Sequence, residues 1–321
     1  MSQPDFTMRH SSLHPYAARH LSHTTKSVPM MEGITPRWFM TFLPWVPVEA
    51  GIYRLTRLKK QSDGAQMDRS CEKPIELGYG HLHENDMPET YPDYEENPNE
   101  YMLSMVQTTL RVNTHVTDIF NSPINQLQEQ MRLTIEAMKE RQEWEILNDH
   151  EFGLLNSVAP SMRIHSRSGA PTPDDMDELL AKVWKKPAFF LAHPRAIAAF
   201  GRECTRRGVP PVAVSIYGSP FITWRGVPLV PTDKLMVNGQ MGTTSILLMR
   251  VGEKEQGVIG LHQPGIPDER DVPSLSVRLA GIDNRGVASY ILSLYFSVAV
   301  LTDDALGMLE NVEVGNYHDH R

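Results

Sequence analysis

Few residues in this sequence have the types and spacing that catalysis needs. Ser70 and Lys73 are separated by two residues, a spacing that on a helix would place a nucleophile beside a base. Pro74 follows directly and no helical pattern surrounds the pair, so we interpret the spacing as chance. The sequence has no phosphate-binding loop, dinucleotide fingerprint, HExxH pair or GxSxG elbow.

Two groups of histidines could offer metal ligands. His81 and His83 alternate, as same-face residues of a strand do, and Glu84 follows them. His318 and His320 repeat the spacing near the C-terminus. No further cluster of ligands lies near either group in the sequence, so we interpret the first as a solvated loop and the second as a tail.

Paired acids occur at 174–175 and at 303–304, where they favour helix starts over acid–base catalysis. Cys71 and Cys204 lie far apart and form no CxxC pair, which is typical of reduced thiols in a cytosolic protein. The N-terminus has no apolar run, so secretion is not indicated. The residues thus form no recognisable catalytic motif.

Composition describes a mildly acidic globular protein. The 321 residues are 40% hydrophobic and 22% charged, with a formal net charge of −8. This balance argues against nucleic acid as the main partner, because phosphate binding needs a basic face. The longest apolar run, "ILSLYFSVAVL" at 291–301, is too short for a membrane helix and predicts a buried strand.

The first half of the chain reads as an arm, a finger and a long helix. Residues 1–33 are polar, and "ITPRWFMTFLPWVPVEAGIYRLTR" at 34–57 is aromatic but interrupted by three prolines, which excludes a long helix. Strands on either side of the acidic segment 84–100 predict a two-stranded finger that needs a partner surface. An apolar stripe with spacings of three and four then predicts a helix at about 123–149.

The second half mixes helices and strands. Thr172 can cap a helix, and a short buried strand at 188–192 precedes a helix at 194–207 that ends at Gly208. Strands are predicted at 275–280 and 290–301. The pattern as a whole indicates an α+β fold.

This order of elements is similar to the Hong Kong 97-type phage major capsid fold, with an N-terminal arm, extended loop, long spine helix, peripheral and axial domains. Four stretches of the sequence make the resemblance more specific. The stretch at 34–57, "FLAHPRAIAAF", "SPFITWRGVPLVPTDKL" and "SILLMRVGEKEQGVIGLHQPGI" resemble the shell protein of family 2 encapsulins from about Val28 onward. One branch of that family carries a cyclic-nucleotide-binding domain in the extended loop. Residues 60–101 are too few for one, so the chain resembles subfamily A.

The resemblance implies a non-enzymatic function. Members assemble into an icosahedral nanocompartment, typically of about sixty subunits (T=1), around a cargo enzyme. In subfamily A the usual cargo is a cysteine desulfurase, with a role in sulfur storage. The resemblance therefore implies a cytoplasmic homo-oligomer with no cofactor of its own, because the pyridoxal phosphate belongs to the cargo. The alternatives are a phage or prophage major capsid protein and, from another class, a soluble enzyme with dispersed site residues.

The resemblance also implies boundaries. They are an N-terminal arm at 1–48, an extended loop at 49–115, peripheral parts at 116–170 and 286–321, and an axial domain at 171–285 around the five-fold axis. A turn at the end of an axial helix often approaches the five-fold pore in this fold. The matching residues are Arg206, Arg207, Gly208 and Val209. The alternative is that these arginines only complete a helix C-terminus.

The aromatic stretch gives the last expectation. Trp38, Phe42 and Trp45 need apolar cover that a short irregular segment cannot supply. We expect them to pack on the peripheral domain of their own subunit and on a neighbouring subunit.

Overall fold

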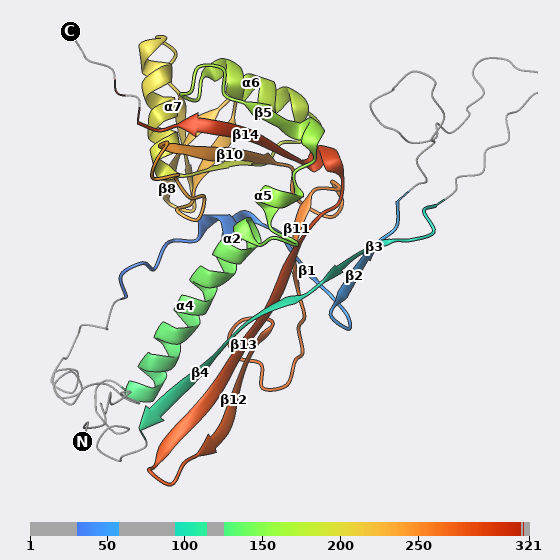
Figure 1. Cartoon of the computed structure of the whole chain (residues 1–321), viewed down its shortest axis with the longest axis vertical. Coiled ribbons are helices and arrows are strands. Elements are labelled where there is room, and N and C mark those ends of the chain that lie inside the picture. Colours follow the sequence, from blue (N-terminus) through green and yellow to red (C-terminus); the bar gives the residue numbers. More distant parts are fainter. Residues whose placement is uncertain (1–30, 58–93, 114–124, 316, 318–321) are drawn as a thin grey trace, which may run out of the picture. The chain divides into compact units, whose positions relative to one another are not determined.

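The computed structural model describes residues 31–57, 94–113, 125–315 and 317 (Figure 1). The chain divides into two compact units. One comprises Ile52–Met102, and the other comprises Met1–Gly51 together with Leu103–Arg321. In the described ranges, no helix is both long and apolar enough to cross a membrane.

The smaller unit contains a two-stranded antiparallel ribbon. Strand β2 (Ile52–Leu55) pairs with β3 (Asn99–Met102). Arg54 Nε lies 2.9 Å from Glu100 Oε1 across the ribbon, with both side chains exposed. The predicted pairing of strands on either side of the acidic segment is therefore confirmed for β2 and β3, whereas residues 104–113 belong to the larger unit.

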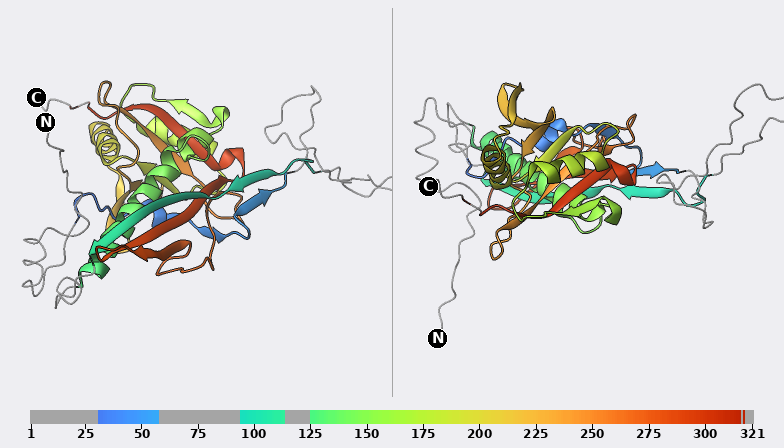
Figure 2. Two further views of the ribbon diagram at one scale, coloured as in Figure 1. Left: turned by 60° about the horizontal axis from the view of Figure 1, so that its bottom comes forward. Right: turned by 90° about the horizontal axis from the view of Figure 1, so that it is seen from above.

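Helix α4 is the longest helix of the larger unit. It spans Gln126–Asn148, inside the range of 123–149 expected from the sequence. The side chain of Asn125 caps it by accepting a hydrogen bond from the Gln128 N–H. Met131, Ile135 and Met138 form its buried stripe. The helix packs on strands β4 and β13, which run side by side (Figures 1 and 2).

A five-stranded sheet is organised around one long strand, β13 (Val287–Val300). β13 forms antiparallel pairs with three strands, and β1 adds to β11 in parallel. The other strands are β1 (Trp45–Pro47), β4 (Ser104–Asn113), β11 (Val258–His262) and β12 (Leu275–Ile282). The strands predicted at 275–280 and 290–301 are therefore confirmed.

A seven-stranded sheet forms the second layer, in the order β5-β14-β10-β6-β9-β8-β7. Its strands are β5 (Arg163–His165), β6 (Phe189–Ala192), β7 (Val212–Ile216), β8 (Ser219–Trp224), β9 (Val227–Pro231), β10 (Thr243–Met249) and β14 (Leu306–Glu313). The predicted strand at 188–192 is confirmed by β6.

Helices pack on both faces of this sheet. They are α6 (Pro173–Lys182), α7 (Pro194–Arg206) and the short α2 (Trp38–Phe42). Phe221 and Trp224 lie three apart on β8, so their side chains point to opposite faces. Phe221 contacts Trp38 of α2, whereas Trp224 contacts Phe200 of α7. α2 and α7 therefore cover opposite faces.

Short elements join these layers. Helix α5 (Leu154–Ser157) and the 3-10 turn η1 (Pro160–Met162) lead from α4 to β5. A second 3-10 turn, η2 (Asp303–Ala305), leads from β13 to β14. The chain thus changes sheets across residues 301–305.

Sheet pairing crosses the expected domain boundaries, which stay a prediction. β14 belongs to the range expected to return to the peripheral domain, yet it pairs with β10 of the axial range. β11 and β12 belong to the axial range, yet they pair with β13. The physical reason is that strand pairing joins segments far apart in the chain, and the turns after Met249 and Val300 carry the chain from one sheet to the other.

Candidate functional site

The end of the arm packs through aromatic rings. The Trp38 and Phe221 ring centroids lie 5.4 Å apart in an edge-to-face contact. The Phe42 ring lies 5.4 Å from that of Phe189 and 5.8 Å from that of Phe221. The contacted residues lie at 189–221, in the range expected to be axial. Trp38 and Phe42 thus contact residues in the range expected to be axial, because α2 covers a face of the seven-stranded sheet. Their packing on the peripheral domain stays a prediction.

Trp45 packs against the other sheet. β1 lies parallel to β11 with Trp45 opposite Gly260, and the Trp45 Nε1–H donates to the Met40 carbonyl oxygen at 3.2 Å. A Cβ at position 260 would come within 2.8 Å of the indole ring. Glycine at this position is therefore what lets the ring lie on the strand. Residues 38–45 thus contact both sheets, and Trp38, Phe42 and Trp45 are half-buried.

A polar clamp holds the residues just before α2. Glu140 of α4 accepts hydrogen bonds from the Thr35 N–H at 2.8 Å and from Arg37 Nη1 at 2.8 Å. Arg37 Nη2 also lies 2.5 Å from Glu136 Oε2. Lys234 Nζ, 2.8 Å away, completes the environment of Glu140. Burial alone would raise the pKa of Glu140, but the hydrogen bonds from Lys234 and Thr35 outweigh it, so the pKa lies below its ordinary value.

Glu143 lies one turn further along α4 and differs in its surroundings. It is 1% exposed, and its Oε1 accepts a hydrogen bond from the Thr232 hydroxyl at 3.0 Å. Its Oε2 is buried and has no hydrogen-bond partner in the described part of the chain. Burial raises the pKa of Glu143 to about 7, against the opposing effects of Thr232 and Lys234. Near pH 7 this side chain is therefore divided between its protonated and its charged form.

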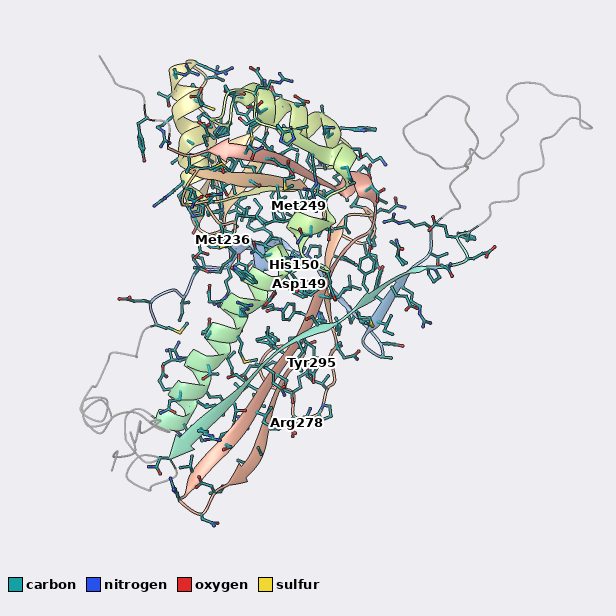
Figure 3. The ribbon with its side chains drawn as sticks, viewed as in Figure 1. Asp149, His150, Met236, Met249, Arg278 and Tyr295 are labelled. Carbon is teal, nitrogen blue, oxygen red and sulfur yellow. The ribbon has the colours of Figure 1, made fainter. Side chains whose placement is uncertain are left out.

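Two cavities open on the larger unit. The first, of ≈420 Å³, lies between the arm, α4 and the five-stranded sheet, and Tyr295 (labelled in Figure 3) lines it. Its other lining residues are largely apolar and include Met40, Trp45, Ile135, Leu275 and Leu294. The second, of ≈520 Å³, is lined by Met236 (Figure 3) and by the start of β10.

The turn after α7 has paired charges. Arg206 Nη2 lies 2.5 Å from Glu203 Oε2, and Arg207 Nη1 lies 2.8 Å from Asp174 Oδ2. Gly208 adopts a φ of 71°, the left-handed conformation that ends a helix, and the Val209 N–H donates to the Cys204 carbonyl. Each arginine of the turn thus has an acidic partner in its own chain, and Val209 is exposed.

The strand that follows this turn has an exposed apolar surface. β7 is the last strand of the seven-stranded sheet. Val212 is 69% exposed and Val214 is 43% exposed. Tyr217 and Gly218, both with positive φ, form the tight turn into β8 and leave the Tyr217 ring largely exposed. Within the described residues no further strand covers the outer edge of β7.

The other sequence expectations have mixed outcomes. Asp175 forms a capping box with Thr172 at the start of α6, which confirms the helix-start interpretation there. Asp303 and Asp304 form the first turn of η2, as expected of a helix start. Cys204 is a free thiol whose pKa burial raises to about 11. Several residues lie outside the described ranges: Ser70, Cys71, Lys73, His81, His83, Glu84, His318 and His320. Among the described residues no cluster of metal-ligating side chains occurs.

Sequence reasoning missed the clamp. In the sequence, Glu136, Glu140 and Glu143 have the pattern of ordinary helix-surface acids. Their partners are distant: Arg37 lies 99 residues before Glu136, and Lys234 lies 94 residues after Glu140. The signal that could have suggested it is their spacing of four and three, which places three acids on one face.

Comparisons with known proteins agree along nearly the whole chain. A family model described as "Type 2A encapsulin shell protein SrpI-like" matches residues 60–316. The chain is 56% identical over 310 residues to the type 2A encapsulin shell protein SrpI of Synechococcus elongatus, covering 97% of both. It is 52% identical over 305 residues to the type 2A encapsulin shell protein of Mycobacterium leprae, covering 95% of both.

Solved structures agree with the fold. The cryo-EM structure of the holo-SrpI encapsulin complex from S. elongatus matches with a TM-score of 0.81 and 53% identity, over 97% of this chain and 99% of that one. The capsid of an empty GTA particle matches with a TM-score of 0.62 at 11% identity, over 94% and 99%. At such low identity the second match shows the fold alone. The expected α+β fold of Hong Kong 97-type capsid proteins is confirmed.

Proposed function

This chain belongs to the type 2A encapsulin shell proteins, and on that premise we propose that its assembled shell encloses a cysteine desulfurase. The chain is a structural protein that forms a capsid-like homo-oligomeric shell. Family membership removes both alternatives raised by the sequence, the phage capsid protein and the soluble enzyme. The enclosed enzyme would use pyridoxal phosphate to strip sulfur from cysteine, so the compartment would serve sulfur storage.

The observation that carries this proposal is the agreement with the holo-SrpI complex over 97% of the chain. The test is to purify shells from the native host and to identify co-purifying proteins by mass spectrometry. We expect one abundant pyridoxal-phosphate enzyme that releases sulfide or persulfide from cysteine. Shells that contain no such enzyme would remove the cargo assignment and leave the shell function intact.

The size of the shell is a second proposal. We infer about sixty subunits with T=1 icosahedral symmetry, because closed point-group symmetry limits a shell of identical subunits. The half-buried aromatic residues of the arm support extensive contacts between copies, as does the edge of β7, which no other strand of the described residues covers. Electron microscopy should show uniform closed particles. A monodisperse monomer in light scattering at micromolar concentration would contradict the proposal.

The pore assignment is a third proposal. We place Arg206, Arg207, Gly208 and Val209 at the five-fold axis, supported by the exposure of Val209 at the end of α7. Cross-linking tests the position: Val209→Cys should give disulfide-linked oligomers on mild oxidation of assembled shells. Trp184→Cys, at a side chain that is 71% exposed, is a control for random collisions. Equal cross-linking of both variants would argue against the assignment.

The pore proposal also predicts a charge effect. Because Glu203 and Asp174 already partner the two arginines, the field at the turn is weaker than two free arginines would produce. Reversing both charges with Arg206→Glu and Arg207→Glu leaves four acids together and should slow the entry of anionic substrates into loaded shells. Unchanged flux would remove the idea of a pore that attracts anions.

A further inference from the structure

Helix α4 carries a stripe of three acids that face the rest of the larger unit. Glu136, Glu140 and Glu143 are spaced by four and three residues, which places them on one face of the helix. Two segments from elsewhere in the chain meet this stripe. They are residues 35–37, just before α2, and residues 232–234, just after β9.

The charges of this cluster balance without Glu143. Lys234 Nζ bridges Glu140 at 2.8 Å and Asp233 at 2.7 Å, and Lys139 lies 3.3 Å from Glu136. Three carboxylates therefore face three cations: Glu136, Glu140 and Asp233 with Arg37, Lys139 and Lys234. A charge on Glu143 would be one negative charge in excess.

Glu143 is placed where such a charge is costly. The charged groups around it are Glu140 on its own helix, and Asp233 and Lys234 on the segment packed against it. Arg37 pairs with Glu140. One of its oxygens has the Thr232 hydroxyl, and the other is buried without a partner in the described residues. A buried, incompletely paired carboxylate favours its protonated form.

We propose that Glu143 is a proton-controlled latch for the end of the N-terminal arm. With its proton in place, the cluster is neutral and Glu140 holds Thr35 and Arg37 against α4. Loss of the proton adds a buried negative charge beside Glu140 and Asp233, and this charge is relieved when α4 and residues 232–234 separate and water enters. Because Glu140 belongs to both contacts, with Lys234 on one side and with Thr35 and Arg37 on the other, that separation loosens the hold on residues 35–37.

The size of the effect follows from linkage. Burial raises the pKa of Glu143 from an ordinary 4.5 to about 7, so the closed clamp retains the proton where the open clamp loses it. The closed clamp is therefore favoured at low pH. This free-energy advantage is lost as the pH rises from 4.5, the ordinary pKa, to about 7, the pKa in the closed clamp. For a single group with these two values, the open fraction rises about tenfold between pH 6 and pH 8.5.

Hydrogen exchange of assembled shells tests the latch. In peptides covering residues 35–43, the protection factor, corrected for the intrinsic pH dependence of exchange, should fall about tenfold between pH 6 and pH 8.5. Glu143→Gln keeps a neutral side chain at every pH and should abolish this dependence. Glu145→Gln, on the same helix in an ion pair with Arg141, is the matched control and should retain it.

A second variant, Thr232→Val, keeps the latch testable if Glu143→Gln does not fold. The Thr232 hydroxyl donates to the Glu143 carboxylate and lowers its pKa. Thr232→Val should therefore shift the loosening of residues 35–43 to higher pH. Protection that is independent of pH in the unmodified protein, or that keeps the same pH dependence in Glu143→Gln, would overturn the latch. The readout is internal to one subunit, so the result is independent of which cargo the shell holds.

Discussion

The guanidinium of Arg250 lies 2.8 Å from the carboxylate of Asp304, at the point where the chain passes from one sheet to the other. Arg250 is 2% exposed, and Lys185 Nζ lies 2.8 Å from the same carboxylate. Burial alone would raise the pKa of Asp304, but hydrogen bonds from Arg250 and Lys185 outweigh it and hold the pKa far below its ordinary value. A buried cation thus depends on one acid in a three-residue turn.

Replacing that acid should weaken the fold. Asp304→Asn leaves the Arg250 guanidinium buried without a counter-charge, which costs roughly 3 kcal/mol of unfolding free energy. The depressed pKa stabilises the fold above the ordinary value near 4, and this stability is lost as the pH falls below it. Urea unfolding should show a large difference from the natural protein at pH 7 and a smaller one at pH 3, because the stabilisation is lost progressively as the pH falls below the ordinary value toward the depressed one. Asp303→Asn, next to it and exposed, is the control and should change little.

Any side chain at position 260 should destabilise the protein. In Gly260→Ala the new methyl group would lie 2.8 Å from the Trp45 ring, so the ring or strand must move, at a cost of about 1–3 kcal/mol. Thermal unfolding should detect the loss. The double variant with Trp45→Val should lose less than the sum of the two single losses, because the valine side chain makes room. Strict additivity would show that the two residues do not contact each other.

The aromatic residues of the arm should affect assembly more than local folding. Trp38→Ala and Trp45→Ala remove rings that contact the two sheets. The rings are half-buried, so part of each is available to contact a neighbouring copy. We expect unchanged far-ultraviolet circular dichroism and a reduced yield of closed particles in size-exclusion chromatography. Trp184→Ala, at a 71% exposed ring, is the control. Normal particles from both arm variants would reduce the stretch to local packing.

The exposed strand β7 offers a similar comparison. Val212→Lys places a charge where the side chain is already 69% exposed, so a single subunit should lose little stability. If a neighbouring copy covers this edge, the charge must be buried on assembly, and closed particles should form poorly. Leu279→Lys tests the exposed end of β12 in the same way. Both yields are measurable by native mass spectrometry, and full assembly of Val212→Lys would show that the edge stays open in the shell.

Local signals made much of the fold predictable. The Thr172 cap, the buried run at β6 and the left-handed Gly208 each depend on neighbours within a few residues, and each occurs where the sequence indicates it. Partner choice among strands was not predictable in this way. β14 and β11 have similar apolar patterns, and only contacts with distant segments decide that they join different sheets.

The candidate site was predictable only in part. The aromatic residues were identifiable because rings between prolines need cover, but the sheet that Trp38 and Phe42 cover depends on Phe189 and Phe221. The spacing of Glu143 from Glu136 and Glu140 places it on one helix face with them but does not predict its burial. A glutamate in a helix normally faces water, and its burial here arises from residues 232–234, about ninety positions later in the chain.

The central position of β14 has a consequence for synthesis. β14 lies between β5 and β10, so the seven-stranded sheet has a gap until residues 306–313 have left the ribosome. Such late, non-local pairing is slow, and a nascent chain without it exposes the edges of two strands. A chain that stops before residue 306 therefore lacks the strand that joins β5 to β10, and the two strand edges it leaves open can pair with other copies.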